Sequence, residues 1–268
     1  MNKIMKDVEE ACNIVDGNSY SNEYGRIYCF SNEDLKALFD SVSVKDKDVL
    51  TVLSSSDQYF YSYYNGARSV DVFDRNKLTK YYYYLRKWGI KYLGKFSLGS
   101  DFIKHTKYIN ELLELVTCSS ESEEEAYSFW YNYIRKVFPF DNSNLFYLGS
   151  RNRNDMDRVD KLYKYIDNDL NFYNGNMKEY YPRNKKYDVI IMSNILEYCD
   201  DRDYYMLKSN LYNLLNENGV VVCSKITNCC NIYTQIRSFS EYFDYEELNK
   251  GYRNGFLGYT YTKNVNKK

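Results

Sequence analysis

The sequence predicts an α/β protein with a Rossmann-like, mostly parallel sheet, helices on both faces, an antiparallel C-terminal edge and a helical insertion. Short apolar, β-branched runs alternate with longer stretches of helical periodicity. Two of these runs lead directly into small and polar residues, where an open parallel sheet contacts its ligand. Near the C-terminus, Asn254-Gly255 between Tyr252 and Phe256 is a hairpin signal that favours an antiparallel edge.

Two domains are expected: a helical N-terminal extension at 1–47 and the Rossmann-like domain at 48–268. In the extension, Ser31–Asp34 precedes Leu35 and Leu38, which is typical of a capped helix start with an apolar face.

The first strand is predicted at Val49–Leu53, since a short apolar run of this kind fits a buried parallel strand. Residues 58–66 would cross over to a second strand at Ser69–Phe73, and a helix should follow over Lys77–Trp88.

A helical insertion is expected at about 89–140, where we predict that substrate selection is built. Its acidic stretch at 121–125 fits a solvated loop or a helix start. The short run Leu145–Leu148 fits a strand or a loop equally well. The remaining predicted elements are a helix near 155–166, strands at 170–173, 188–192 and 220–224, and a helix at about 202–215.

The turn after the first strand, Ser54 to Asp57, contains no glycine. A pyrophosphate cradle normally needs glycine, so NAD and FAD are disfavoured. Ser54, Ser55 and Ser56 still allow close approach, and Asp57 could pair with a ligand's amino group. Asp74, twenty positions after Ser54, ends the second strand, where an acid accepts hydrogen bonds from ribose hydroxyls. S-Adenosylmethionine meets these requirements, because it combines an adenosine, a sulfonium and a free amino acid.

Two further groups are candidate contacts. Asn176 and Met177 follow the predicted third strand, where the amide could bond the adenine edge and the thioether could pack on the ring. The alternative is that Gly175 and Asn176 are ordinary turn residues. Ser193 and Asn194 follow the fourth strand as a further cofactor contact, although the asparagine could instead cap the next helix.

No catalytic residue is predicted. His105 is the only histidine, which argues against histidine triads, dyads and histidine-rich metal sites. Glu197, Tyr198 and Asp200 are the nearby candidates for a base, and each also fits a surface helix residue.

The overall composition limits the kinds of binding partner that we expect. A net charge of -1 gives no broad nucleic-acid footprint, and no apolar run reaches the ~20 residues that span a bilayer. Seven cysteines without a predicted signal peptide favour reduced thiols and a cytoplasmic location. We expect a small-molecule or lipid acceptor, and the sequence leaves the oligomeric state open.

Val49–Leu85 combines a strand, the triple-serine turn, the run ending in Asp74, Arg75 and Asn76, and an aromatic helix. It resembles the cofactor-binding region of the S-adenosylmethionine:diacylglycerol 3-amino-3-carboxypropyltransferases, the betaine-lipid synthase type. The segment Tyr187–Tyr198 is similar to that family's fourth-strand motif. The resemblance implies a class I methyltransferase-like fold with S-adenosylmethionine as ligand, and it extends the candidate contacts to Arg75 and Asn76.

Three functions follow as alternatives. The leading one is an S-adenosylmethionine-dependent transferase, with methyl transfer ahead of aminocarboxypropyl transfer to a hydroxyl acceptor such as a lipid. The second is a non-catalytic Rossmann scaffold for protein binding, favoured by the missing glycine loop and the lack of a clear base. The third, an NAD-dependent enzyme, is opposed by the triple-serine turn.

Overall fold

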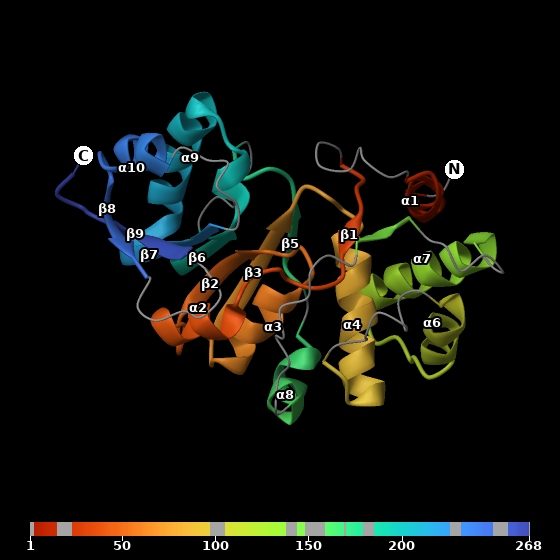
Figure 1. The fold of residues 1–268 in the computed structure, drawn as a ribbon. Coiled ribbons are helices and arrows are strands. Elements are labelled where there is room, and N and C mark those ends of the chain that lie inside the picture. Colours follow the sequence, from red (N-terminus) through yellow and green to blue (C-terminus); the bar gives the residue numbers. More distant parts are fainter. Residues whose placement is uncertain are drawn as a thin grey trace. The chain divides into compact units, whose positions relative to one another are not determined.

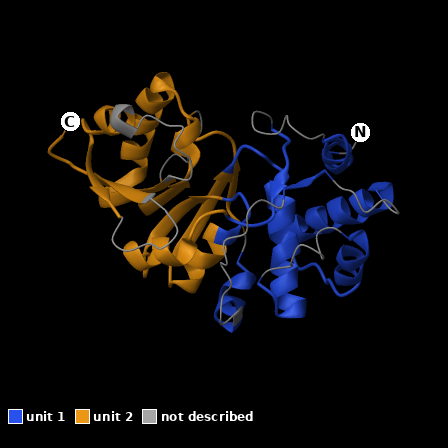
Figure 2. Cartoon of the chain, viewed as in Figure 1, with its two compact units in different colours: residues 1–31, 53–57, 74–169 blue, residues 32–52, 58–73, 170–268 orange. Residues whose placement is uncertain are grey.

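The computed structural model of the chain describes residues 3–14, 23–96, 105–137, 144–147, 159–168, 170–178, 185–225, 232–248 and 257–267. The chain forms two compact units (Figure 2). Unit 1 comprises residues 1–31, 53–57 and 74–169, and unit 2 comprises residues 32–52, 58–73 and 170–268.

Unit 2 is built on a seven-stranded sheet in the order β5-β3-β2-β6-β7-β9-β8 (Figure 1). The pairs β2–β3, β2–β6 and β6–β7 are parallel, whereas β7–β9 and β8–β9 are antiparallel. The strands are β2 (Asp48–Val52), β3 (Ser69–Asp74), β5 (Phe172–Asn174), β6 (Tyr187–Ser193), β7 (Leu215–Lys225), β8 (Phe243–Glu247) and β9 (Leu257–Lys263). The predicted fold class, a mostly parallel sheet with an antiparallel C-terminal edge, is confirmed.

The strand order reverses direction at β2. The chain runs from β2 outward to β3 and β5, then returns to place β6 on the other side of β2. In an open α/β sheet, the carboxyl ends of the strands at such a switch point are where ligands bind. The carboxyl ends of β2 and β6 lie at this switch point.

Helices cover both faces of this sheet. In Figure 1, α2 (Leu35–Ser41) and α3 (Asp57–Tyr64) lie on one side of the sheet, and α9 (Asp201–Leu214) and α10 (Ile232–Phe239) lie on the other. The strands between them are rich in Val, Ile and Leu because both of their faces are buried. The α2 helix begins as predicted, with the Asp34 side chain accepting a hydrogen bond from Ala37 N at 3.0 Å.

Unit 1 is mainly helical. Its elements are α1 (Lys3–Cys12), β1 (Ile27–Tyr28), α4 (Thr79–Leu93), α6 (Thr106–Leu113), α7 (Glu121–Val137), β4 (Phe146–Tyr147), the short 3-10 helix η1 (Val159–Leu162) and α8 (Tyr163–Ile166). The helical character expected for 89–140 is confirmed where the structure describes it, and the acidic stretch forms the first turn of α7. Acidic residues stabilise a helix at its N-terminus. The run Leu145–Leu148 contributes a two-residue strand that pairs with β1.

Several elements extend beyond the residues that the sequence predicted for them. The α4 helix continues to Leu93, past the predicted end at Trp88, and closes on Gly94 in the left-handed conformation with φ 61°. The β7 strand begins at Leu215, although only 220–224 show the apolar run. The predicted hairpin turn at 254–255 lies outside the described residues, between β8 and β9, which do pair. Within the described ranges, we find no helix with the length and apolar character needed to cross a membrane.

Candidate functional site

Three serines at strand ends have a left-handed backbone. Ser54 has φ 41° and Ser56 has φ 67°, both in the turn after β2, and Ser193 at the end of β6 has φ 53°. The only other non-glycine residues with positive φ in the described chain are Asp46 and Asn218, two types that adopt this conformation more readily. For serine the conformation costs about 1–2 kcal/mol, and such strain is found preferentially at functional sites.

Asp74, the last residue of β3, connects two turns of unit 1. The first turn follows β2, and the second turn follows β3. Its Oδ2 accepts a hydrogen bond from Ser54 N at 2.8 Å, and its Oδ1 accepts one from Asn76 N at 2.9 Å. Burial raises the pKa of this carboxyl to about 6, although the backbone donors, the Thr79 hydroxyl and the charge of Arg75 act in the opposite direction. The structure therefore presents a carboxylate that titrates close to neutrality, held by backbone donors beside the triple-serine turn.

Asp57 ends the triple-serine turn and is 2% exposed. Its Oδ2 accepts from Ser31 N at 2.5 Å and from Ser55 Oγ at 3.0 Å. Its Oδ1 accepts from the Arg86 guanidinium at 2.5 Å, and the same nitrogen donates to Ser55 O at 2.5 Å. Arg86 gives Asp57 a cationic partner within the protein, because a buried carboxylate needs its charge balanced where it lies.

Arg86 was not found from the sequence. It is 1% exposed on α4, within a run of buried aromatic side chains, and its second guanidinium nitrogen donates to Phe96 O at 3.0 Å. A charged residue inside an otherwise apolar helix face was the available signal, because a fully buried arginine is rare unless it is paired.

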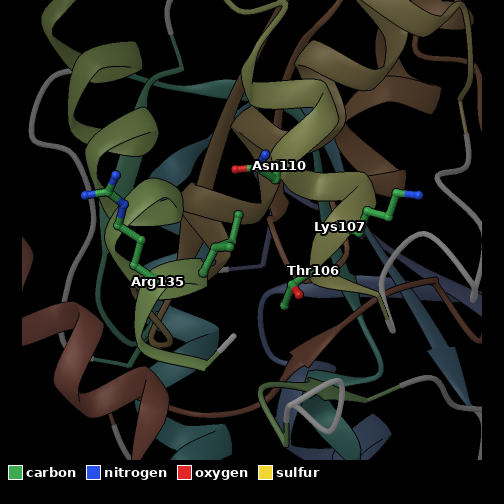
Figure 3. A pocket seen from close by; sticks show the side chains of 5 residues that line it. Thr106, Lys107, Asn110 and Arg135 are labelled. Atoms are coloured by element: carbon green, nitrogen blue, oxygen red, sulfur yellow. The ribbon is translucent and has the colours of Figure 1, made fainter. Parts of the chain in front are cut away.

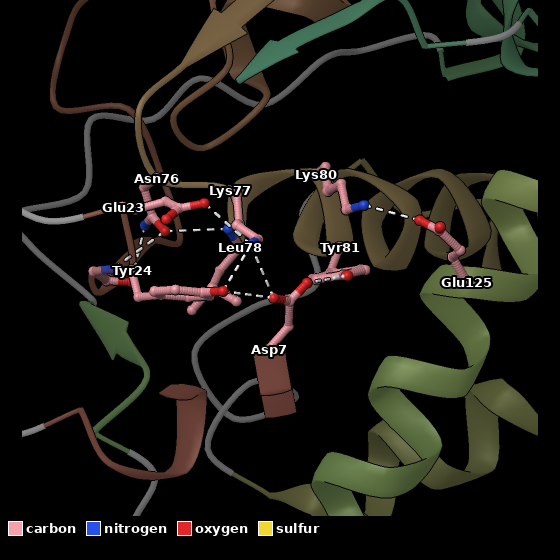
Figure 4. Close-up of polar contacts among 10 residues, drawn as sticks. Asp7, Glu23, Tyr24, Asn76, Lys77, Leu78, Lys80, Tyr81 and Glu125 are labelled. Carbon is pink, nitrogen blue, oxygen red and sulfur yellow. Dashed lines mark hydrogen bonds and ion pairs between the residues drawn. The ribbon is translucent and has the colours of Figure 1, made fainter. Parts of the chain in front are cut away.

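The Asn76 side chain is fully engaged inside unit 1 (Figure 4). Its Oδ1 accepts from Gly25 N at 3.2 Å and from Leu78 N at 3.1 Å. Its Nδ2 donates to Gly25 O at 2.9 Å and to Arg26 O at 3.2 Å. These hydrogen bonds make Asn76 a clamp that fixes the second turn to residues 25–26, and Arg75 beside it is exposed.

A third buried carboxylate lies next to this clamp (Figure 4). Asp7 on α1 is fully buried and accepts from Tyr24 Oη at 2.8 Å, Tyr81 Oη at 2.6 Å and Lys77 Nζ at 3.1 Å. Burial alone would raise the pKa of Asp7, but these three donors outweigh it and hold the pKa below its ordinary value. All its partners come from the protein, so this network anchors α1 to the start of α4.

In unit 2, Ser193 and Asn194 form the end of β6. Ser193 is 7% exposed, and its Oγ lies 3.4 Å from Asn194 Oδ1. Asn194 precedes the 3-10 helix η2 (Ile195–Tyr198), but its side chain makes no capping hydrogen bond to that helix. The capping role considered from the sequence is thus not what this side chain performs.

Asn176 and Met177, which follow β5 in unit 2, act within the protein. Asn176 Oδ1 accepts from Lys178 N at 3.1 Å, the bond of an ordinary turn residue. Met177 is 3% exposed and packs in the core cluster with Leu50, Val52 and other side chains. The packing of Met177 on an adenine ring stays a prediction, beside the observed place of its side chain in the sheet's own core.

The three residues considered as bases follow β6. Glu197 is 9% exposed, and Tyr198 is 66% exposed. Asp200 caps α9 by accepting from Asp203 N at 2.8 Å. The position of Asp200 is thus explained by the helix start.

A separate hollow of about 510 Å³ lies between α6 and α7 (Figure 3). It is lined by Thr106, Lys107, Asn110, Ile134 and Arg135. The side chains of Lys107 and Arg135 extend to opposite sides, so the two positive charges do not converge on one point. Lys107 lies 3.7 Å from Glu111, and Arg135 lies over the Tyr131 ring. Among the described residues, no three His, Cys, Asp or Glu side chains gather to hold a metal ion.

No protein-family model matches the chain, and no curated protein matches it. Several solved structures with a similar fold are methyltransferases. A TehB-like SAM-dependent methyltransferase from Corynebacterium glutamicum is 10% identical, with a TM-score of 0.46, over 87% of this chain and 89% of that one. The N-methyltransferase NodS from Bradyrhizobium japonicum, in complex with S-adenosyl-L-homocysteine, is 8% identical (TM-score 0.39; 85% and 83% covered). The magnesium protoporphyrin IX methyltransferase ChlM from Synechocystis, with bound SAM, is 8% identical (TM-score 0.39; 86% and 76% covered). Because these identities and TM-scores are low, the chemistry of this chain has to come from its own residues.

Proposed function

We propose that this protein is an S-adenosylmethionine-dependent transferase, with methyl transfer as its reaction. The observation that carries the proposal is Asp74, an acid at the end of β3 that is hydrogen-bonded to the turn after β2. Two serines of that turn have the left-handed backbone that glycine supplies in nucleotide-binding loops. The sequence departs from a glycine-rich loop, and the backbone keeps the conformation such a loop needs.

The start of α3 argues against a dinucleotide. A pyrophosphate would be held at a helix N-terminus, but the first residue of α3 is Asp57, whose buried carboxylate is balanced by Arg86. Because Arg86 is already paired with Asp57, it cannot also balance the charge of a diphosphate. S-Adenosylmethionine carries a nucleoside without a diphosphate, so it suits an acidic helix start better than NAD or FAD.

Each candidate residue receives a role. Asp74 accepts hydrogen bonds from the ribose hydroxyls, and Ser54, Ser55 and Ser56 present the turn to the methionine part. Asp57 and Asn76 hold the two turns in shape through contacts inside unit 1. Arg75 lies on the exposed side of the second turn.

In unit 2, Ser193, Asn194 and Asn176 remain predicted cofactor contacts. The left-handed backbone of Ser193 favours a functional role for the end of β6. Alanine variants of these residues, titrated singly with S-adenosylhomocysteine, test each contact.

When bound, S-adenosylmethionine supplies an electrophilic carbon on a sulfonium. An acceptor nucleophile would form the new bond as the carbon–sulfur bond breaks, and a hydroxyl acceptor would also lose its proton. The protein's part is to align the acceptor and exclude water, since such displacements depend mainly on positioning. Attack on the methyl group leaves S-adenosylhomocysteine, whereas attack on the γ-carbon leaves methylthioadenosine. The second product would indicate aminocarboxypropyl transfer to an acceptor such as a lipid.

Calorimetric titration with S-adenosylmethionine, S-adenosylhomocysteine and NAD tests the proposal. We expect the first two to bind and NAD not to bind. Asp74→Ala should weaken S-adenosylhomocysteine by about 1.5–3 kcal/mol, roughly 10- to 150-fold. The matched control is Asp71→Asn, on the same strand, where the carboxylate accepts from Tyr187 Oη at 2.7 Å and should not affect the ligand. Absence of binding by either sulfur compound would refute the proposal in favour of a non-catalytic scaffold.

A further inference from the structure

We propose that Arg86 is the positioning residue that holds the glycine-free serine turn in its left-handed shape. The proposal rests on the proposed function, because the turn is the part of unit 1 assigned to the cofactor. Arg86 lies on α4, outside both turns, and reaches the centre of the first one. One guanidinium nitrogen donates both to Ser55 O and to Asp57 Oδ1, each at 2.5 Å.

The contacts of Arg86 lie at the left-handed part of the turn. Ser55 lies between the two left-handed residues, Ser54 and Ser56. Its carbonyl is held by Arg86, and its Oγ donates to Asp57, which Arg86 also holds. On either side, Ser54 N donates to Asp74, and Ser56 N donates to Leu53 O at 2.5 Å. The arginine thus cross-links the middle and the end of a segment in which the serines themselves disfavour the observed backbone.

Arg86 is itself fixed in place. Its second guanidinium nitrogen donates to Phe96 O at 3.0 Å, and the guanidinium carbon lies 4.6 Å from the centre of the Phe96 ring. Both members of the ion pair are buried, Arg86 at 1% and Asp57 at 3% side-chain exposure. Only arginine has a planar group able to satisfy a carboxylate and two carbonyls at once, whereas lysine is a compact point charge.

The neighbouring residue provides a matched control. Lys87, next on α4, also forms a buried ion pair, with Glu123 at 2.9 Å and exposures of 4% and 1%. That pair joins α4 to α7, whereas the contacts of Arg86 reach the turn. If Arg86 merely stabilises the helix packing, loss of either ion pair should have the same consequence. If Arg86 shapes the turn, only its loss should alter ligand binding, and glycine in the turn should compensate.

The experiment titrates S-adenosylhomocysteine into the full chain and its Arg86→Lys and Lys87→Met variants. A third variant combines Arg86→Lys with Ser54→Gly and Ser56→Gly, and a fourth carries the two glycines alone. We expect Arg86→Lys to weaken binding by about tenfold or more, because the turn then visits its binding shape only part of the time. Lys87→Met should bind as the wild type does, and the two glycines should restore most of the affinity in the Arg86→Lys background. Equal losses in the two single variants, or no recovery with glycine, would overturn the proposal.

Unfolding in urea separates this proposal from the proposed function. If the wild type binds no S-adenosylhomocysteine, the proposed function fails, but the same variants still form a double-mutant cycle in stability. The two glycines should then recover stability in the Arg86→Lys background by more than they add to the wild type, and strict additivity would overturn the role of Arg86. If Arg86→Lys alone does not fold, the two glycines should restore a cooperative unfolding transition. A combined variant that stays unfolded would contradict the proposal.

Discussion

The pKa of Asp74 makes the proposed ribose contact testable by pH alone. Burial raises this pKa to about 6, so the carboxyl changes its charge in a range where many proteins stay folded. Only the ionised form offers both oxygens as acceptors, and charge-assisted hydrogen bonds are the stronger kind. If Asp74 holds the ribose, the affinity for S-adenosylhomocysteine should fall as the pH drops through about 6.

The size of the effect follows from the same value. With a pKa of about 6, about nine-tenths of Asp74 is ionised at about pH 7 and about one-tenth at about pH 5. If the protonated form does not bind, the affinity falls about tenfold over this range, which corresponds to about 1.4 kcal/mol. Above about pH 7 the affinity should be nearly constant.

Calorimetric titrations at four pH values from about 5 to about 8 would measure this dependence. Asp74→Asn keeps the size of the side chain but cannot ionise, so its affinity should be weaker and nearly independent of pH. Any titration of the ligand itself appears equally in both proteins and cancels in the comparison. A flat profile for the wild type, or the same slope in wild type and Asp74→Asn, would refute the assignment of Asp74 to the ribose.

The other predictions concern stability. Because the folded-state pKa of Asp74 is raised from 3.8 to about 6, this group stabilises the fold below about pH 3.8, and the stabilisation is lost as the pH rises through about 6. The full change is about 3 kcal/mol, which urea unfolding of the wild type against Asp74→Asn would measure; equal pH profiles would contradict it. Ser56→Gly should leave the free energy of unfolding unchanged or raise it by up to about 1.5 kcal/mol, since relief of about 1–2 kcal/mol of strain is set against about 0.5–1 kcal/mol of chain entropy. Ser56→Ala keeps the left-handed strain, so a Gly variant less stable than the Ala variant would argue against it. Met177→Ala should lower the free energy of unfolding by about 2–5 kcal/mol, as for other buried large side chains, while the affinity for S-adenosylhomocysteine changes little. A large affinity loss with normal stability would return Met177 to the cofactor site.

The parallel strands at the centre of the sheet could be predicted from local sequence. Buried parallel strands need continuous apolar runs, and those at Val49–Leu53 and 220–224 mark β2 and the second half of β7. The first half of β7 carries Asn and Glu and could not be recognised, because its pairing comes from neighbouring strands and not from its composition.

The candidate site was harder to predict because its contacts are distant along the chain. Asp57 and Arg86 are 29 positions apart, and Asn76 and Gly25 are 51 apart, so no local pattern links them. The absence of glycine from the serine turn was visible in the sequence, but the left-handed backbone conformation that the serines adopt was not. Serine is not a residue type that signals a left-handed conformation.

The most direct test of the central claim is a crystal structure of the protein with S-adenosylhomocysteine. We predict that the ribose hydroxyls lie within hydrogen-bond distance of the Asp74 carboxylate, with Asp57 still paired to Arg86. A bound nucleoside whose ribose contacts a different acid, or lies away from the end of β3, would contradict the account.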